Sequence, residues 1–301
     1  MLWVSTFYRG GVCGFDGVKI LGVNLYMNIL VTGSAGFIGG HLVERLRSLG
    51  HSVVGVDLLP GDYQFDICNK VSLDRLFEKE CPDLVFHLSA NTNVPLSVKD
   101  PLFDFRSLQG ALNVIDKRVP LIFTSSSFVY GNTPNRPTRE VEPFHLSAPY
   151  GIVKHTIEQY LAFYGFPHVI VRPATVYGPR QVKGAMADYI DKILEGGSAE
   201  IYGEKTRDYI YVSDVVDALI LLMEHLDGEV YNIGTGVETS LNRLYEMLGG
   251  RTPILKEGRD GEVVNQSLDC SKLRSLGWSP KVSLIEGLER TVNAKRKTKE
   301  N

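Results

Sequence analysis

The chain has 301 residues, 44% hydrophobic and 22% charged, and its 32 basic and 35 acidic residues give a net charge of −3. This length is enough for about two domains and a large core, and the composition excludes disordered, collagenous and disulfide-dense proteins. The near-neutral charge argues against a nucleic-acid partner, and no run approaches the roughly 18 to 20 apolar residues of a membrane-spanning helix.

The four cysteines and seven histidines show no spacing typical of metal ligands, so we expect no metal site. Such scattered cysteines are typical of free thiols in a reducing cytoplasm, the compartment that we expect. Residues 1–26 are glycine-rich and lack the basic start and apolar core of a signal peptide. Because Met27 opens a natural first strand, we expect the native chain to start there, after a non-native or disordered extension.

Apolar runs and helical periodicities alternate along the chain from Asn28. The pattern predicts strands at 28–32, 52–57, 83–87, 121–124 and 168–172, and helices at 37–49, 72–80, 101–117 and 149–163. After about Tyr177 it predicts helices at 188–195, 213–224, 240–248 and 284–294, short strands at 200–202 and 230–233, and a frayed, solvated tail. The alternation indicates an α/β fold: a Rossmann-type doubly wound parallel sheet with a smaller, mixed α/β C-terminal substrate domain.

A glycine-rich turn joins the first strand to the first helix, with Gly33, Gly36 and Gly39 spaced G-x-x-G-x-x-G. Glycine allows a tight turn and lets a pyrophosphate approach the main-chain N–H groups at a helix N-terminus. A strand-to-helix turn can need glycine without any ligand. However, Asp57 ends the second strand, where an acid binds the adenosine ribose and repels a 2′-phosphate. The combination predicts a dinucleotide site that favours NAD over NADP.

Tyr150 and Lys154 are four residues apart in a predicted helix and therefore lie on one face. A free phenol has a pKa near 10, and a nearby ammonium and a positively charged nicotinamide would lower it. Such a tyrosine can take the proton from a sugar hydroxyl while hydride leaves the same carbon. The alternative is a surface tyrosine and lysine on an amphipathic helix.

Three serines, Ser125, Ser126 and Ser127, follow the buried strand at 121–124. Ligands bind at the carboxyl ends of strands in open α/β sheets, although the serines also suit simple capping of the strand end. The chain has no nucleophile elbow or His–Asp partner set that would identify a hydrolase.

These elements in this order resemble the extended short-chain dehydrogenase/reductase family, and within it the NAD-dependent nucleotide-sugar epimerases, most of all UDP-glucose 4-epimerases. The resemblance runs nearly end to end from Met27. Its segments are TGSAGFIGGHLVERL, VVGVD, DLVFHLSA, FTSSSFVYG, YGIVK, VRPATVYGPR, TRDYIYVSDVVDA, VYNIGTG, GRDGEV and LDCSKLRSLGWSP.

The resemblance implies a role for individual residues. Ser126, Tyr150 and Lys154 would be catalytic, with Tyr150 as the base. The NAD site would consist of Gly33, Gly36, Phe37, Ile38, Gly39, Asp57, Asp66, Ile67, Leu88, Ser89, Ala90, Tyr150, Lys154 and Pro173. The substrate would contact Ser126, Tyr150, Thr175, Arg207, Tyr209 and Arg259, and arginine suits phosphate because of its planar fork.

The residues after Ser126 bear on the type of reaction. Nucleotide-sugar 4,6-dehydratases of this family usually have Asp and Glu there, and related decarboxylases keep the Glu. Here the positions are Ser127 and Phe128, which cannot act as carboxylate acids or bases. The chain departs from the usual pattern at Ser107 and Thr175, each in place of an asparagine, and has shortened loops.

We therefore expect an isomerase that interconverts the C4 epimers of a UDP-sugar, with UDP-glucose and UDP-galactose favoured, through a 4-keto intermediate and a tightly bound, recycled NAD. UDP-glucuronate, UDP-N-acetylhexosamines, a net oxidoreductase and a nucleotide-sensing binding protein remain as alternatives. The resemblance also implies a homodimer. The expected NAD domain comprises 27–175 and about 211–235, and the sugar-nucleotide domain about 176–210 and 236–301.

Overall fold

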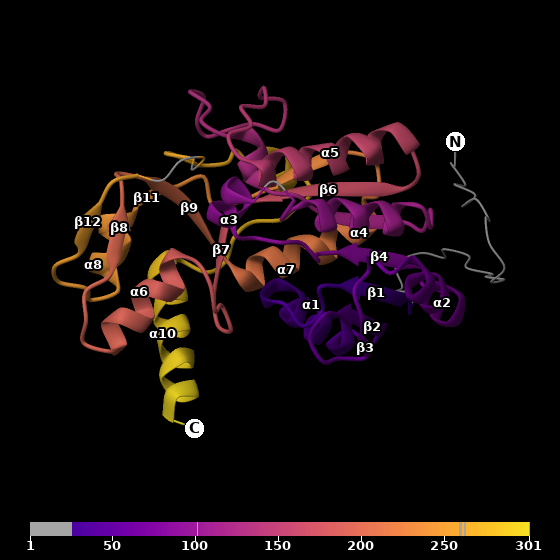
Figure 1. Ribbon diagram of the computed structural model, residues 1–301, viewed down its shortest axis with the longest axis horizontal. Coiled ribbons are helices and arrows are strands. Elements are labelled where there is room, and N and C mark those ends of the chain that lie inside the picture. The colour runs from indigo at the N-terminus through magenta and orange to yellow at the C-terminus, as the bar shows by residue number, and fades with distance from the viewer. Residues whose placement is uncertain (1–25, 101, 259–260, 262, 301) are drawn as a thin grey trace.

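The computed structural model describes residues 26–100, 102–258, 261 and 263–300. Its main sheet has seven strands, all parallel, in the order β10-β6-β5-β4-β1-β2-β3 (Figure 1). Strands that follow β1 in the sequence lie on both sides of it, and this reversal of strand order creates the crevice where ligands bind in such sheets. The strands are β1 (Asn28–Thr32), β2 (Ser52–Asp57), β3 (Tyr63–Gln64), β4 (Leu84–His87), β5 (Leu121–Thr124), β6 (His168–Pro173) and β10 (Val230–Ile233).

Helices cover both faces of this sheet because both faces of each central strand are apolar. In β1, Ile29 and Val31 join one buried cluster and Leu30 joins the other. The pair α1 and α7 packs on the first face, and the pair α4 and α5 packs on the second (Figure 1). The helices are α1 (Phe37–Ser48), α2 (Lys70–Glu80), α3 (Val94–Lys99), α4 (Phe105–Ile115), α5 (Pro149–Tyr164) and α7 (Val212–Leu221).

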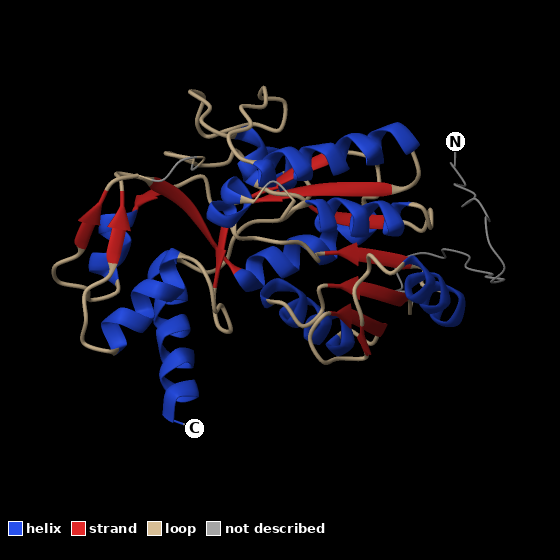
Figure 2. Cartoon of the chain, viewed as in Figure 1, coloured by secondary structure: helices blue, strands red, loops and turns tan. Residues whose placement is uncertain are grey.

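A smaller unit lies beyond the carboxyl ends of the main strands (Figure 2). It has its own buried cluster, with Tyr177, Tyr189, Tyr209 and Tyr245 among its members. One sheet has the order β11-β9-β7, and the other pairs β12 with β8. Its elements are β7 (Thr175–Tyr177), β8 (Glu200–Tyr202), β9 (Thr206–Tyr211), β11 (Glu238–Ser240), β12 (Ile254–Lys256), α6 (Ala185–Leu194), α8 (Leu241–Met247) and α10 (Leu284–Glu300). The short helix α9 (Ser271–Arg274) packs instead against β10 of the large sheet.

The predicted α/β class and the main strands and helices are confirmed. The short elements β3 and α9 were not predicted, and the structure differs at three further places. The helix expected at 101–117 begins only at Phe105, and α3 precedes it as a separate helix. The tail expected to fray continues α10 to Glu300, held in part by Lys295, whose amino group lies 2.5 Å from the Asp191 carboxylate of α6. The short strands of the smaller unit at 175–177, 206–211, 238–240 and 254–256 were not predicted.

The cysteine prediction is only partly right. Cys68 and Cys270 are free thiols, but Cys81 is disulfide-bonded. Among the described residues, no group of His, Cys, Asp and Glu is arranged to hold a metal ion, and none of the described helices is long and apolar enough to span a membrane. The predicted extension at 1–26 lies, apart from Tyr26, outside the described residues.

Candidate active site

The turn between β1 and α1 has room only for glycine at two positions. Gly33 has a φ of 74°, and a Cβ there would lie 2.8 Å from the main-chain nitrogen of Ser89. A Cβ on Gly39 would lie 2.0 Å from the carbonyl oxygen of Gly33. Gly36 precedes α1, and no described side chain caps the helix or places an acid in its first turn. The exposed main-chain N–H groups of this turn fit a pyrophosphate.

Asp57 ends β2 beside this turn. One carboxylate oxygen accepts a hydrogen bond of 3.0 Å from the main-chain N–H of Ala35, and the other accepts one of 3.0 Å from Leu59. The carboxylate is therefore fixed next to the glycines, as the sequence predicted for an acid that binds a ribose. Phe37 and Ile38 open α1 with their side chains packed against the buried cluster of the smaller unit, so their main chain is the part that faces the turn.

Asp66 and Ile67 lie at the β3 side of the sheet, after the strand that follows Asp57. The Asp66 carboxylate accepts a hydrogen bond of 2.8 Å from the main-chain N–H of Cys68 and forms an ion pair with Arg106 of α4. Burial opposes ionisation, but these contacts together hold the pKa of Asp66 below its usual value. The Ile67 side chain fills the space beside Gly110, where a Cβ would lie 2.7 Å from it.

Leu88, Ser89 and Ala90 follow β4 and border the glycine turn. The Ser89 hydroxyl hydrogen-bonds that of Thr32 at 3.0 Å, and Thr32 Oγ1 lies 2.8 Å from Nδ1 of the buried His87. Burial and the charge of Lys154 lower the pKa of His87 to about 3, so this imidazole is neutral at physiological pH. The ends of β1 and β4 are thus joined by neutral polar groups.

Ser126 and Tyr150 come together from β5 and α5. Ser126 caps a short 3₁₀ helix, Ser127–Tyr130, and accepts a hydrogen bond of 3.2 Å from the N–H of Phe128. Its side chain also lies near enough to the Tyr150 phenol to lower the pKa of that group. The Phe128 ring packs edge-to-face on the Tyr150 ring, with centroids 5.9 Å apart. The structure thereby brings the predicted serine and tyrosine into contact and places an aromatic ring beside them.

Lys154 lies one helical turn after Tyr150 and is buried, with 4% of its surface exposed. Its amino group donates a hydrogen bond of 2.7 Å to the carbonyl oxygen of Thr124 and lies 4.9 Å from the centre of the Phe123 ring. Burial lowers the pKa of Lys154 to about 8, although the carboxylates of Glu158 and Asp104 have the opposite effect and raise it. The lysine is therefore still an ammonium at pH 7.

Tyr150 is not a phenolate in the protein alone. Burial raises its pKa to about 12, and the nearby Ser126 side chain lowers it only in part. The lowering of this pKa by the lysine ammonium and a bound nicotinamide together stays a prediction. Deprotonation near neutral pH needs additional positive charge in the site.

The residues predicted to contact substrate lie where the large sheet passes into the smaller unit. Pro173 ends β6, and Thr175 begins β7, where it pairs with Tyr209 of β9. Arg207 lies two residues before Tyr209 and donates hydrogen bonds to the carbonyl oxygens of Thr206 and Val264. Neither contact neutralises the guanidinium, so it can pair with an anion. Arg259 lies outside the described residues.

Sequence reasoning missed a polar contact on the α3–α4 side of Tyr150. The hydroxyl of Ser97 accepts a hydrogen bond of 2.8 Å from the main-chain N–H of Tyr150. Asp104 is 2% exposed, and neither of its oxygens has a well-formed hydrogen bond to a described group. Burial raises the pKa of Asp104, while the Ser97 hydroxyl and Lys154 lower it only in part. No local pattern marks either residue, because the contacts join separate helices.

A buried ion pair behind the site was also missed. Glu158 lies four residues after Lys154 and binds Arg172 of β6 through both carboxylate oxygens, at 3.0 and 2.6 Å. The spacing of Tyr150, Lys154 and Glu158 on one helix face was a usable signal. The arginine that neutralises the carboxylate is visible only in the fold.

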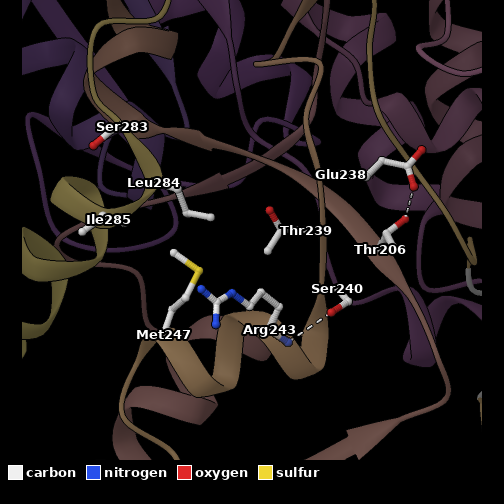
Figure 3. A pocket seen from close by; sticks show the side chains of 9 residues that line it. All are labelled: Thr206, Glu238, Thr239, Ser240, Arg243, Met247, Ser283, Leu284 and Ile285. Atoms are coloured by element: carbon white, nitrogen blue, oxygen red, sulfur yellow. Dashed lines mark hydrogen bonds between the residues drawn. The ribbon is translucent and has the colours of Figure 1, made fainter.

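A cavity of about 630 Å³ lies in the smaller unit, away from these residues (Figure 3). Met247, Leu284 and Ile285 lie on one side of it, and Glu238 accepts a hydrogen bond from Thr206 on the other. None of the predicted site residues lines it. We therefore do not assign the chemistry to this cavity.

Comparison with known proteins places these features in a family context. The model of the NAD dependent epimerase/dehydratase family matches residues 29–234. A relative from Methanocaldococcus jannaschii, a putative UDP-glucose 4-epimerase, is 35% identical over 88% of this chain and 97% of its own length.

Two solved structures are similar over nearly their whole length. UDP-glucose 4-epimerase from Thermotoga maritima with UDP-glucose is 39% identical, with a TM-score of 0.85 over 90% of this chain and 99% of that one. UDP-glucose 4-epimerase from Thermus thermophilus in complex with NAD is 32% identical, with a TM-score of 0.83 over 89% and 98%.

Proposed function

The chain belongs to the NAD dependent epimerase/dehydratase family, and from this premise we propose that it interconverts the C4 epimers of a UDP-sugar. We favour UDP-glucose and UDP-galactose as the pair of substrates, because the relatives of this chain are named UDP-glucose 4-epimerases. The observation that carries the proposal is the contact of Ser126 with Tyr150, one helical turn from the buried ammonium of Lys154.

NAD fits the strand ends of the large sheet. The turn at Gly33 and Gly39 excludes side chains, and the carboxylate of Asp57 is fixed beside it. A bound NAD would supply reversible hydride transfer at C4 of the sugar and, in its oxidised form, positive charge in the site. The other proposed contacts are Gly36, Phe37, Ile38, Asp66, Ile67, Leu88, Ser89, Ala90 and Pro173.

The side chains of the protein take up and return the proton of the C4 hydroxyl. We assign Tyr150 as the group that takes the proton from the C4 hydroxyl and returns it after the 4-keto sugar has turned over. Ser126, which lies beside the phenol, is assigned to orient the sugar hydroxyl. The ammonium of Lys154 stabilises the Tyr150 phenolate in the states in which the C4 hydroxyl of the sugar still carries its proton.

Epimerisation is favoured over water loss because no carboxylate follows Ser126. Ser127 is buried, and the ring of Phe128 packs against the Tyr150 ring. An apolar edge there leaves the 4-keto sugar with no acid or base to eliminate a hydroxyl. A net oxidoreductase is the second candidate, because the same three residues serve net hydride transfer equally well.

The sugar nucleotide is proposed to bind between the two units. Arg207, which pairs with no described carboxylate, is assigned to the diphosphate, together with Arg259. Thr175 and Tyr209, paired between β7 and β9, are assigned to the sugar side of the site. We propose the expected division, with the NAD domain at 27–175 and about 211–235 and the sugar-nucleotide domain in the remainder after residue 176.

A homodimer through α4 and α5 is also proposed. Together these helices expose large apolar side chains, including Phe105 at 56%, Ile152 at 48% and Phe163 at 83%. An apolar surface of this kind on a pair of adjacent helices is typical of an interface. Sedimentation of the wild type and of the Phe163→Lys variant tests the assignment, and a monomeric wild type contradicts it. We also propose a cytoplasmic location: the free thiols Cys68 and Cys270 support it, whereas the disulfide of Cys81 argues against it.

The function is tested by incubating purified protein, without added cofactor, with UDP-galactose, UDP-N-acetylgalactosamine or UDP-glucuronate. We expect the C4 epimer of at least one sugar with no net change at the NADH absorbance band. Tyr150→Phe is expected to lower turnover about 10²- to 10⁴-fold with NAD still bound, whereas Tyr160→Phe on the same helix is expected to be active. NADH that accumulates after NAD addition, without any epimer, favours the net oxidoreductase.

A further inference from the structure

Glu158 is the third residue on the α5 face that carries Tyr150 and Lys154, and it is 3% exposed. One carboxylate oxygen accepts a hydrogen bond of 2.5 Å from the hydroxyl of Ser125 and one of 3.0 Å from Nε of Arg172. The other oxygen accepts one of 2.6 Å from Nη2 of Arg172. The carboxylate is thus fully bonded inside the protein.

Each partner of Glu158 adjoins a residue of the site. Ser125 precedes Ser126, and the N–H of Ser125 donates a hydrogen bond of 2.8 Å to the carbonyl oxygen of Val171 in β6. Arg172 precedes Pro173 at the end of β6. One carboxylate therefore ties together the carboxyl ends of β5 and β6 and the helix that carries the base.

The network continues away from the site. Nη1 of Arg172 donates a hydrogen bond of 2.8 Å to the hydroxyl of Tyr130, which donates one of 2.8 Å to Oδ1 of Asn232 in β10. A buried ion pair is often no more stabilising than apolar residues of the same volume. Stability alone therefore does not account for an ion pair at this position.

We propose that Glu158 is a positioning residue for the reaction, which fixes Ser126 through Ser125 and places a buried carboxylate one helical turn from the amine of Lys154. The inference rests on the proposed function, since it concerns the same serine, tyrosine and lysine. It gives the ion pair of Glu158 and Arg172 a role in the reaction in addition to its role in holding the fold together.

The charges around Lys154 support the second part of this role. Glu158 and Asp104 are the carboxylates that raise the pKa of Lys154, and burial lowers it to about 8. His87 on β4 is neutral, and Tyr150 is a phenol in the protein alone.

Glu158 itself stays ionised despite its burial. Burial opposes ionisation, but His155, Arg172 and Ser125 hold the pKa of Glu158 below its usual value. An ionised carboxylate one helical turn away therefore offsets part of the cost of burying the lysine charge.

The test is Glu158→Gln, which keeps the shape and removes the charge. We expect turnover to fall at least about tenfold, and the alkaline limb of the pH profile of kcat/KM to move about one unit lower. NAD content is expected to stay at the wild-type level. Glu158→Asp keeps the negative charge but moves it away from Arg172. This variant is expected to have lower turnover and an alkaline limb at the wild-type pH.

Tyr130→Phe is the matched structural control. It removes the outer hydrogen bonds of the same network and retains the Glu158 carboxylate, so it is expected to lower thermal stability without moving the alkaline limb. The inference is overturned if Glu158→Gln and Tyr130→Phe change only stability, by similar amounts.

A second readout is independent of epimerase activity. The ε-carbon resonance of Lys154 in ¹³C-lysine-labelled protein, assigned by its absence in Lys154→Arg, reports the titration of the amine directly. In Glu158→Gln this titration is expected at lower pH than in the wild type. An unchanged titration contradicts the inference even if the substrate proves to be different, whereas a shifted titration without epimerisation contradicts only the proposed function.

Discussion

The amino group of Lys154 lies 2.7 Å from the carbonyl oxygen of Thr124, the last residue of β5. Ser126 follows Thr124 by two residues, so the same strand end holds the serine and anchors the lysine. Because Tyr150 lies one helical turn before Lys154, this one hydrogen bond sets where α5 meets the sheet. This contact, together with those of Ser97 and Glu158, positions the three proposed catalytic groups.

The titration of Lys154 predicts the alkaline pH dependence. Burial lowers its pKa to about 8, so the ammonium is present below that pH and is lost as pH rises through it. We expect kcat/KM to be nearly constant between about pH 6 and 7.5 and to fall about tenfold per unit above 8. In Lys154→Arg, whose guanidinium stays charged, this limb is expected to disappear while turnover falls. Wild-type activity that stays constant to pH 9.5 contradicts this assignment.

The glycine turn predicts a large difference between two neighbouring positions in α1. A Cβ at Gly39 would lie 2.0 Å from the carbonyl oxygen of Gly33, whereas one at Gly40 would lie 3.4 Å from the mobile end of Arg180. Gly39→Ala is expected to lower the free energy of unfolding by about 1–3 kcal/mol and to abolish NAD retention.

Gly40→Ala is the control for this prediction. It is expected to be neutral or to stabilise the helix by up to about 1 kcal/mol, with NAD retained. Urea unfolding and the NAD content of the purified variants provide the measurement. Equal NAD content in the two variants would show that the turn does not hold the cofactor.

Asp57 predicts the choice of cofactor. Both carboxylate oxygens are held by main-chain N–H groups at the end of β2, so a negative charge is fixed where a 2′-phosphate would lie. Asp57→Asn is expected to lower the ratio of NAD to NADP affinity about tenfold or more, as measured by calorimetry on cofactor-free protein. Asp83→Asn is the control. Asp83 accepts a hydrogen bond from the main-chain N–H of Asn28 at the amino ends of the strands, whereas Asp57 lies at their carboxyl ends. An unchanged ratio in Asp57→Asn refutes the ribose assignment.

Asp104 predicts a variant that is more stable than the wild type. Burial raises the pKa of Asp104, so the folded protein binds this proton more tightly than the unfolded chain, and stability is lost as pH rises through that pKa. Asp104→Asn is expected to raise the free energy of unfolding at pH 7 by about 1–2 kcal/mol and to have no such effect near pH 3.5.

Urea unfolding at the two pH values measures the Asp104 effect. Asp62→Asn is the control, because Asp62 is exposed and paired with Arg47, and its removal is expected to change stability by less than about 1 kcal/mol. If Asp104→Asn lowers stability at pH 7, the Asp104 carboxylate has a partner that stabilises the fold by more free energy than its burial costs.

Local patterns were sufficient for the parts of the site that lie within one turn or one helix. The spacing of the glycines and the i, i+4 relation of Tyr150 and Lys154 follow from backbone geometry, and the structure has them in the predicted elements. The contact of Ser126 with Tyr150 needed the family resemblance, because β5 and α5 are separate in the chain.

The remaining contacts depend on the fold. Ser97 and Tyr150 are far apart in the sequence and meet only where α3 packs against α5. β7 has only three residues, and β9 begins with the polar run Thr206–Asp208, so no alternation of apolar and polar residues marks either strand. The two strands form by pairing with each other. The tail after residue 294 is composed of good helix formers, and its ion pair with α6 favours the helix over fraying.

The most direct test of the account follows the hydrogen at C4. UDP-galactose deuterated at C4 is incubated with the protein in the presence of excess unlabelled NAD and NADH, and the UDP-glucose formed is analysed by mass spectrometry and NMR. The account predicts that the product retains deuterium at C4, because the same hydrogen leaves and returns within one turnover. Deuterium in the free NADH pool, with an unlabelled product or with none, would contradict it.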